Sequence, residues 1–182
     1  LSDLLKETGL KPKANWVLAE GSDTSGMTRS IPIEKILGDC LIAWAMNGEA
    51  LRPEQGYPAR LVVPGWEGNM WVKWIRRLEF GDKPYMTREE TSKYTDLLTD
   101  GKARMFTWVM EAKSVVTSPS PEKPILHKGI QQLRGLAWSG KGKIKRVDVS
   151  LDGGKNWRTA QLHAPIMSKS LVRFTLPFEW SG

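Results

Sequence analysis

The sequence predicts a mostly β protein of the α+β class, on two observations. Segments rich in β-branched and aromatic residues, bounded by glycine, proline and polar turn residues, recur along the chain in a pattern typical of strands. Helical patterns are few, and the clearest covers residues 1–9. In the last third of the chain the short strands follow one another at regular spacing, which favours a β-sandwich.

The length allows one large domain or two small ones, and the charge is spread unevenly along the chain. The chain has 182 residues, of which 40% are hydrophobic and 26% charged, as in a globular protein. Residues 112–182 carry 12 Lys and Arg against 4 Asp and Glu, a charge of +8, whereas residues 1–111 carry 15 against 16. We therefore expect domains at residues 1–111 and 112–182, and the closely spaced prolines of residues 118–124 give the clearest linker signal.

Composition excludes several classes of protein. No recognised DNA- or RNA-binding motif accompanies the basic charge, so we expect no nucleic acid partner; an acidic protein partner or a solvated surface stays open. No apolar run approaches the roughly 18 to 20 residues that span a bilayer, so no membrane span is expected. The single cysteine, Cys40, excludes an internal disulfide and a zinc site of several thiolates, and we expect it to be a small buried side chain.

The first half contains mixed elements. Residues 1–9 predict a short helix with Ser2 as N-cap and Gly9 at its end, and residues 16–19 a strand that enters a polar, glycine-rich loop at residues 20–26. Residues 30–37 fit a strand or the start of a helix. The absence of an initiating methionine and the strand-like final residues lead us to expect a fragment that lacks both ends.

The middle and last segments predict mainly strands. Residues 40–46 are expected to form a buried strand, and Asn47-Gly48 predicts a hairpin that returns through residues 49–51. Further strands are expected at residues 59–63 and 71–80, followed by a long polar connection at residues 81–110. The sandwich strands are expected at residues 132–137, 144–151, 157–162 and 171–176.

Residues with catalytic chemistry are few. His127 and His163 lack the partners of a Ser-His-Asp or metal site, and we expect ordinary surface or capping histidines. The loop at residues 20–26 could hold an anion on its backbone amides, although it lacks the lysine of a phosphate-binding loop.

A group of cations and one phenol stand out. The cations are Arg60, Lys73, Arg76 and Arg77, and they fit either an anion site or a solvated strand face. Tyr94 follows them in a polar segment. A phenol near fixed cations can hold an oxyanion, and a surface tyrosine is the alternative.

Four segments together resemble one family. They are residues 45–51 (Ala-Met-Asn-Gly-Glu-Ala-Leu) leading into 56–65 (Gly-Tyr-Pro-Ala-Arg-Leu-Val-Val-Pro-Gly), residues 72–75 (Val-Lys-Trp-Ile), residues 135–140 (Gly-Leu-Ala-Trp-Ser-Gly), and residues 146–157 (Arg-Val-Asp-Val-Ser-Leu-Asp-Gly-Gly-Lys-Asn-Trp). The chain resembles the sulfite oxidase family of molybdenum enzymes through them. Residues 65–71 and 86–94 are similar to its sulfane dehydrogenase branch, specifically the molybdenum subunit from bacterial sulfur oxidation.

The resemblance implies a fold and a cofactor. Residues 1–111 would be the C-terminal part of the molybdopterin-binding domain, and residues 112–182 the N-terminal part of an immunoglobulin-like dimerisation domain. The intact protein would hold the molybdenum cofactor, a pterin dithiolene. The residues that match the family's cofactor contacts are Asp23, Gln55, Arg60, Trp71, Val72 and Lys73. Gln55 stands where sulfite oxidases have a histidine.

The resemblance also implies a reaction. Tyr94 matches the active-site tyrosine, and the reaction would be the two-electron oxidation of a sulfur centre, sulfite or a carrier-bound sulfane or persulfide. Electrons would pass to a cytochrome c in the periplasm, from a homodimer joined by the sandwich domain. The molybdenum-binding cysteine would precede Leu1 and a substrate-binding arginine would follow Gly182, so we expect no metal ligand and little activity in this segment alone. A catalytically inert dimerisation or docking module that uses the basic sandwich is the alternative.

Overall fold

The computed structural model describes all 182 residues, which form two compact units, Leu1–Trp108 and Val109–Gly182. The chain has three short α-helices and fifteen strands. This confirms the predicted fold class, α+β with mostly β structure. The proline-rich segment at residues 118–124 is no boundary, because it lies inside the second unit between two paired strands. No helix is long and apolar enough to cross a membrane.

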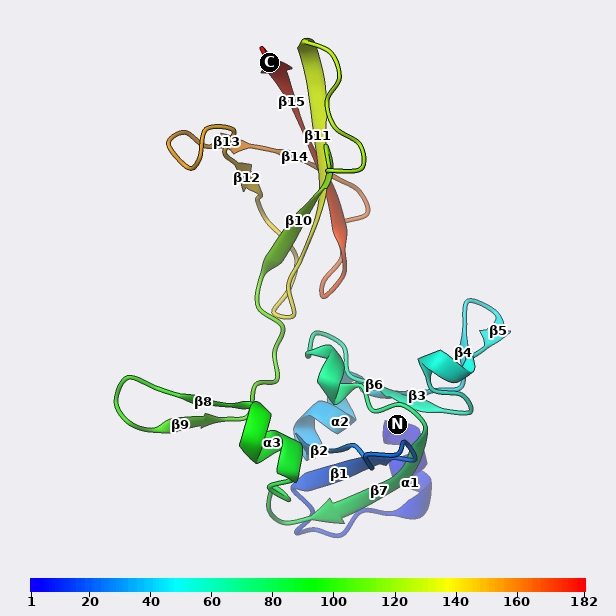
Figure 1. The fold of residues 1–182 in the computed structure, drawn as a ribbon. Helices are drawn as coiled ribbons and strands as arrows, with labels where there is room; N and C mark the ends of the chain where they lie inside the picture. Colours follow the sequence, from blue (N-terminus) through cyan, green and yellow to red (C-terminus); the bar gives the residue numbers. More distant parts are fainter. The chain divides into compact units, whose positions relative to one another are not determined.

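An antiparallel three-stranded sheet organises the first unit, in the order β2-β1-β7 (Figure 1). Its strands are β1 (Trp16–Gly21), β2 (Thr28–Pro32) and β7 (Ile75–Gly81). The central strand, β1, is buried from its second residue onwards, because it has a neighbour on each side. The buried apolar residues of this unit come together in one core: Leu5, Val17, Ala19, Ile31, Ile33, Ile36, Cys40, Leu61, Val63, Met70 and Val72.

Two helices belong to this core. Helix α1 (Ser2–Thr8) ends at Gly9, whose φ of 76° suits glycine, but its N-cap is Leu1 and not the expected Ser2. Helix α2 (Ile33–Asp39) follows β2 directly, so residues 30–37 form the end of a strand and the start of a helix. Cys40 closes α2 and is buried, as predicted.

Short hairpins follow. Strand β3 (Leu41–Ala43) pairs with β6 (Arg60–Val62), and β4 (Ala45–Met46) pairs with β5 (Glu49–Ala50). Asn47 and Gly48 have φ of 54° and 84°, the positive values that a tight hairpin turn needs, so the predicted hairpin is confirmed. Residues 40–46 are not one buried strand, because Leu41 and Met46 are exposed.

The rest of the first unit is more ordered than its polar sequence predicts. Two 3-10 turns, η1 (Pro53–Gln55) and η2 (Gly68–Met70), flank β6, and residues 71–74 precede β7 without joining a sheet. The expected long connection at residues 81–110 contains helix α3 (Arg88–Lys93) and a hairpin of β8 (Thr95–Leu97) with β9 (Ala103–Met105). Buried Glu90 caps α3 and accepts hydrogen bonds from β2, so the helix is anchored to the sheet.

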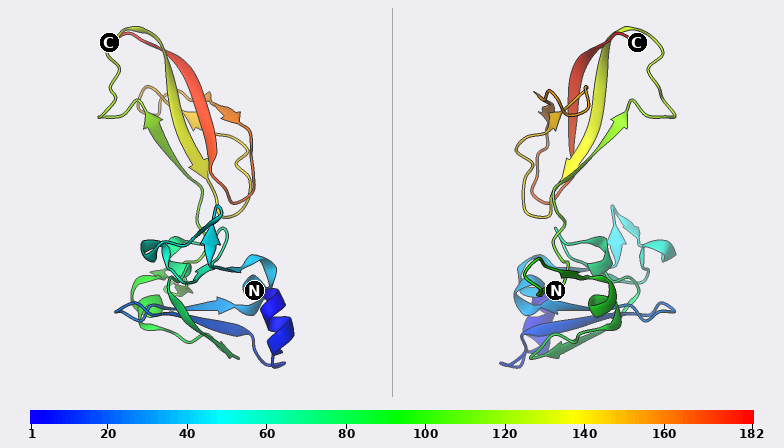
Figure 2. Two further views of the ribbon diagram at one scale, coloured as in Figure 1. Left: turned by 90° about the vertical axis from the view of Figure 1, so that its right-hand side faces the viewer. Right: turned by 60° about the vertical axis from the view of Figure 1, so that its left-hand side comes forward.

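The second unit is a small β-sandwich. Its main sheet has the order β10-β11-β15-β14, and Figure 2 shows the long strands β11 and β15 side by side. The strands are β10 (Lys113–Ser118), β11 (Gly129–Trp138), β14 (Gln161–His163) and β15 (Val172–Trp180). A second sheet pairs β12 (Asp148–Val149) with β13 (Arg158–Thr159), so the strand expected at residues 157–162 is divided in two.

Alternation along the main sheet separates a core face from a polar face. Val172, Phe174, Leu176 and Phe178 of β15 are buried, and the residues between them are exposed or half-buried. Opposite Phe174 stands Gly135, where a Cβ atom would lie 2.2 Å from Phe174 Cζ and 2.5 Å from the Val115 carbonyl oxygen. Glycine is therefore required at position 135 because the aromatic ring occupies the space of a side chain.

Candidate functional site

Two neighbouring hollows lie where the loop after β1 meets the segment before β7. The smaller one has a volume of about 230 Å³ and is lined by Asp23, Met27, Gly68, Asn69, Trp71, Val72, Lys73 and Trp74. The larger one, about 590 Å³, shares Asp23 and Trp74 with it and is also lined by Ser22, Thr24, Tyr57, Pro58 and Ile75. The smaller hollow thus brings together four of the six residues expected to contact a cofactor.

Asp23 shapes its own loop. Its Oδ1 accepts a hydrogen bond of 3.0 Å from the Met27 amide, and its Oδ2 accepts one from the Ser25 hydroxyl. The bond from Ser25 holds the pKa of Asp23 below its ordinary value, so the carboxylate is ionised at neutral pH. Gly21 lets this loop approach its neighbour, since a Cβ atom there would lie 2.7 Å from the Lys73 carbonyl oxygen.

Arg60 joins two segments behind the hollow. Its Nη1 donates to the Gln55 carbonyl and its Nη2 to the Trp71 carbonyl, both at 3.0 Å. Its Nε is buried and has no acceptor, and burial lowers the pKa of the guanidinium. Arg60 therefore fixes Trp71 at the wall of the hollow and keeps one unused donor.

Gln55 and Lys73 meet at the 3-10 turn η1. The Gln55 side-chain oxygen accepts a 3.4 Å hydrogen bond from the Arg52 amide, and Lys73 Nζ donates to the Glu54 carbonyl at 2.9 Å. Lys73 Nζ also lies 4.5 Å from the centroid of the Trp74 ring. Gln55 and Arg60 themselves line neither hollow.

Arg76 and Arg77 are not free cations. Both bind Glu20, whose side chain is only 9% exposed, and Arg77 Nε lies 2.7 Å from Glu20 Oε2. The hydrogen bond from Arg76 lowers the pKa of Glu20. Of the cations that the sequence suggests, Arg60 and Lys73 are the two associated with the hollow.

Tyr94 lies at the end of α3, where its carbonyl accepts a 2.8 Å hydrogen bond from the Thr107 amide. The guanidinium carbon of Arg29, on β2, lies 3.8 Å from the centroid of the Tyr94 ring. Arg29 also donates to the Asn69 carbonyl and to its side-chain oxygen, and Asn69 lines the smaller hollow. Tyr94 is thus connected to the hollow through two residues that the sequence analysis did not identify.

No pattern in the sequence reveals Arg29. It stands in a polar run, Thr28-Arg29-Ser30, where an exposed side chain would be the ordinary expectation, yet its side chain is completely buried. Arg29 becomes a candidate site residue only because its guanidinium carbon lies 3.8 Å from the ring centroid of Tyr94, 65 positions later in the chain (94 − 29 = 65).

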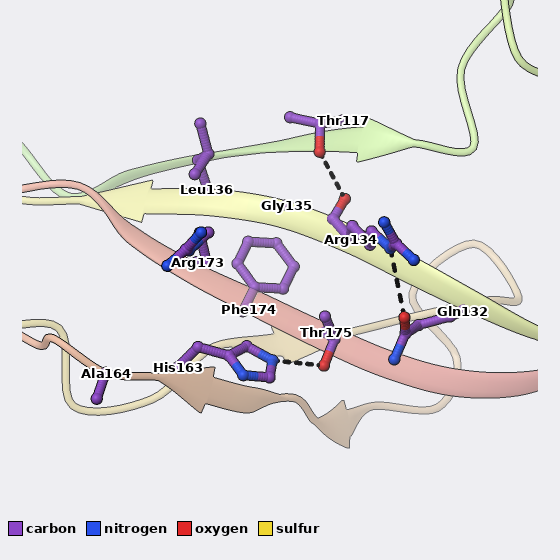
Figure 3. Close-up of a pocket in the computed structure, with 10 residues that line it drawn as sticks. All are labelled: Thr117, Gln132, Arg134, Gly135, Leu136, His163, Ala164, Arg173, Phe174 and Thr175. Atoms are coloured by element: carbon purple, nitrogen blue, oxygen red, sulfur yellow. Dashed lines mark hydrogen bonds between the residues drawn. The ribbon is translucent and has the colours of Figure 1, made fainter.

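A separate hollow of about 550 Å³ lies on the main sheet of the second unit (Figure 3). The charged or titratable groups that line this hollow are those of Arg134, Arg173 and His163, and no carboxylate lines it. His163 lies on strand β14, and its Nε2 lies 2.8 Å from the Thr175 hydroxyl. His127 is exposed, and no cluster of His, Cys, Asp and Glu in the chain could hold a metal ion.

Comparisons with known proteins agree on one family. The model of the oxidoreductase molybdopterin-binding domain matches residues 1–89, and that of the Mo-co oxidoreductase dimerisation domain matches residues 104–173. The solved structure of the sulfane dehydrogenase SoxCD from Paracoccus pantotrophus is 61% identical, with a TM-score of 0.93, over 99% of this chain and 46% of that one.

Curated relatives agree. Mitochondrial sulfite oxidase from Drosophila melanogaster is 34% identical over 89% of this chain and 32% of its own length. Sulfite oxidase from Gallus gallus is 35% identical over 73% of this chain and 31% of its own length. The chain spans about a third of the length of these relatives, and it belongs to the sulfite oxidase family of molybdopterin-binding oxidoreductases.

Proposed function

We propose that this chain is part of a molybdenum-cofactor oxidoreductase that oxidises a sulfur centre, a sulfane or persulfide sulfur or sulfite. The observation that carries the proposal is the smaller hollow, because residues matching the family's cofactor contacts line it and Tyr94 is connected to its wall. The 61% identity to a sulfane dehydrogenase supports sulfane sulfur over sulfite.

The donors and acceptors around the hollow fit a pterin-dithiolene cofactor. The Asp23 carboxylate accepts two hydrogen bonds and has further lone pairs, which suit the N–H groups of a pyrimidine edge. Lys73 uses one of its three N–H donors on the Glu54 carbonyl, so two are available to a phosphate. The buried Arg60 Nε, without an acceptor, is a third donor of the right kind.

The other expected contacts have different roles. Trp71 and Val72 line the hollow with apolar surface, against which a flat ring system can pack. The Gln55 side-chain oxygen is used within η1, and its amide nitrogen remains as a neutral donor where sulfite oxidases have a histidine. We propose all six residues as cofactor contacts.

Tyr94 is the residue that we propose to act on the substrate. When bound, the molybdenum cofactor supplies the oxygen-atom and two-electron chemistry, as cofactors generally supply the difficult step. The Tyr94 hydroxyl can donate a hydrogen bond to an oxyanion of the substrate and pass or receive a proton there. The guanidinium carbon of Arg29 lies 3.8 Å from the centroid of the ring that carries this hydroxyl.

The proposal extends to the location, oligomeric state, electron acceptor and substrate of the intact protein. We propose a periplasmic homodimer joined by the second unit, with electrons passed to a cytochrome c and a substrate that is carried on a protein. The match to a dimerisation domain over residues 104–173 supports the dimer.

The test uses the intact natural protein. We expect one molybdenum per chain by mass spectrometry and sulfur-dependent reduction of a cytochrome c. Tyr94→Phe should lower kcat by about 100-fold, the usual size of an acid-base or oxyanion contribution, whereas Tyr85→Phe, outside the site, should not. A metal-free intact protein, or a Tyr94→Phe enzyme of wild-type activity, would contradict the proposal.

A second candidate function is a catalytically inert docking module. The observation that favours it is the hollow on the second unit with Arg134, Arg173 and His163 and no carboxylate, because such a surface attracts an acidic partner (Figure 3). Docking without molybdenum in the intact protein would support it.

A further inference from the structure

Arg29 is an unusual residue for a fully buried position on an edge strand. It lies on β2 opposite Ala19, and no part of its side chain is exposed to solvent. Arginine is rarely buried unless it is paired, because removing a charge from water is costly. Yet its hydrogen bonds go to Asn69 and not to a carboxylate, and its Nη1 is buried without any acceptor.

The guanidinium makes different contacts at its face and at its edge. Its carbon Cζ lies over the Tyr94 ring, 3.8 Å from the ring centroid, and its edge donates from Nε and Nη2 to the backbone and side-chain oxygens of Asn69. A planar guanidinium can stack and donate in its own plane at the same time, which an ammonium group cannot do. Asn69 is held further by Glu67, to which its side-chain amide donates at 3.0 Å.

Three glutamates and the Tyr94 phenol lie near enough to Arg29 to influence its charge. Burial lowers the pKa of Arg29, and this is opposed first by Glu90 and then by Tyr94, Glu89 and Glu67. Glu90 is itself occupied by Ser30 and Thr87, which donate to its carboxylate. The sheet therefore keeps an arginine whose buried N–H donor has no acceptor, which costs free energy of folding. A methionine of similar volume would avoid this cost. A functional constraint explains such a residue better than stability does.

We propose that Arg29 is a positioning residue, which fixes the Tyr94 ring relative to the turn Gly68–Met70 and hence to the smaller hollow. The proposal rests on the proposed function of Tyr94. Misplacing a reacting group by about 1 Å can lower a rate by about 100-fold, so a rigid link between the two segments matters for the reaction. Arg29 would act on kcat through Tyr94 and would not itself bind substrate.

A double-mutant cycle in the intact protein tests this role. Arg29→Met, which keeps the side-chain volume, should lower kcat per bound molybdenum by about tenfold or more and change KM by less than about threefold. In the Tyr94→Phe background the same substitution should lower kcat by less than about twofold, because Arg29 acts through the phenol. Arg104→Met removes an exposed arginine of β9 and should change neither kcat nor KM.

A crystal structure of Arg29→Met gives a readout independent of activity. We expect the Tyr94 ring displaced from its wild-type position, with the molybdenum content unchanged. If Arg29→Met does not fold, Arg29→Lys takes its place; it keeps the charge but not the planar fork, and should show the same loss in kcat.

The outcomes separate this inference from the proposed function. Multiplicative effects of Arg29→Met and Tyr94→Phe, an undisturbed Tyr94 ring, or wild-type kcat in Arg29→Lys would each overturn the positioning role. An unaffected Tyr94→Phe enzyme would instead overturn the function proposed for Tyr94 and the inference with it.

Discussion

The Arg60 Nη2 donates a hydrogen bond of 3.0 Å to the carbonyl oxygen of Trp71, eleven residues later in the chain. With the equal bond from Nη1 to the Gln55 carbonyl, it connects the turn η1 to the wall of the proposed cofactor site. Arg60 thus ties the backbone of the wall at Trp71 to the turn η1. Arg60 is the residue whose loss should affect both stability and cofactor binding.

Arg60→Lys is expected to destabilise the protein and to lower its molybdenum content. A lysine lacks the planar fork with which Arg60 reaches the two carbonyls, and a buried acceptor left without its donor costs about 1–3 kcal/mol. Urea denaturation and metal analysis by mass spectrometry measure the two effects. Arg52→Lys, at an exposed arginine beside the same turn, is the matched control and should behave as the wild type. Equal stability of the two variants would contradict the structural role of Arg60.

Glu90→Gln is expected to loosen helix α3. The buried carboxylate accepts hydrogen bonds from the Ser30 amide, the Ser30 hydroxyl and the Thr87 amide, and a glutamine would direct an N–H group towards these donors. We expect a loss of about 1–3 kcal/mol in the free energy of unfolding, measured by urea denaturation. Because Tyr94 ends this helix, kcat should fall as well.

The control for Glu90 is an exposed carboxylate. Glu122 lies in the exposed loop after β10. The variant Glu122→Gln should therefore have a free energy of unfolding within about 0.5 kcal/mol of wild type. Equal free energies of unfolding for Glu90→Gln and Glu122→Gln would contradict the conclusion that Glu90 anchors α3.

Gly135→Ala is expected to destabilise the second unit. The new methyl group would lie 2.2 Å from Phe174 Cζ and 2.5 Å from the backbone oxygen of Val115, so the sheet must shift. Overpacking of this kind typically costs about 1–3 kcal/mol, visible as a lower Tm in calorimetry. Gly142→Ala is a suitable comparison, since a Cβ atom there has no heavy atom within 4 Å. A Tm of Gly135→Ala at or above that of Gly142→Ala would contradict the packing described.

The loop at residues 150–156 should make stability depend on pH in acid. Hydrogen bonds from Asn156 lower the pKa of Asp152 to about 2, below its ordinary value of 3.8. The folded state therefore prefers the ionised form, and its stabilisation is present above pH 3.8 and lost as the pH falls towards 2. The Tm difference between wild type and Asp152→Asn should be largest near neutral pH and vanish near pH 2; a difference that grows in acid would contradict this.

Local sequence patterns predicted the local features of the fold. The Asn47-Gly48 hairpin, the strand at Trp16 and the helix end at Gly9 depend on the conformations of a few adjacent residues. The buried polar contacts depend instead on partners far apart in sequence. Glu20 pairs with Arg76, and Arg29 packs on Tyr94, and neither pairing has a local signal.

The same distinction explains the site. Resemblance to a family identified four lining residues of the smaller hollow, Asp23 and Trp71 to Lys73, and the last three lie in segments that carry recognisable motifs. It did not identify Arg29, which lies in none of these segments, and it gave no role to Asn69. The contact between these two residues arises only when β2, η2 and the end of α3 come together. Residues that connect functional groups without a motif of their own become visible only in three dimensions.

If the second unit docks an acidic partner, its affinity should fall with salt. Arg173 lies exposed on β15 without an ion-pair partner, and Arg134 and His163 line the same hollow (Figure 3). Calorimetric titration of the intact protein with a cytochrome c, the electron acceptor proposed above, should show weaker binding at about 300 mM than at about 20 mM salt. Arg134→Gln and Arg173→Gln should each weaken binding about twofold to fivefold at low salt and reduce the salt dependence, whereas Lys155→Gln, outside the hollow, should not. Salt-insensitive binding, unchanged by both arginine substitutions, would exclude the hollow as the docking surface.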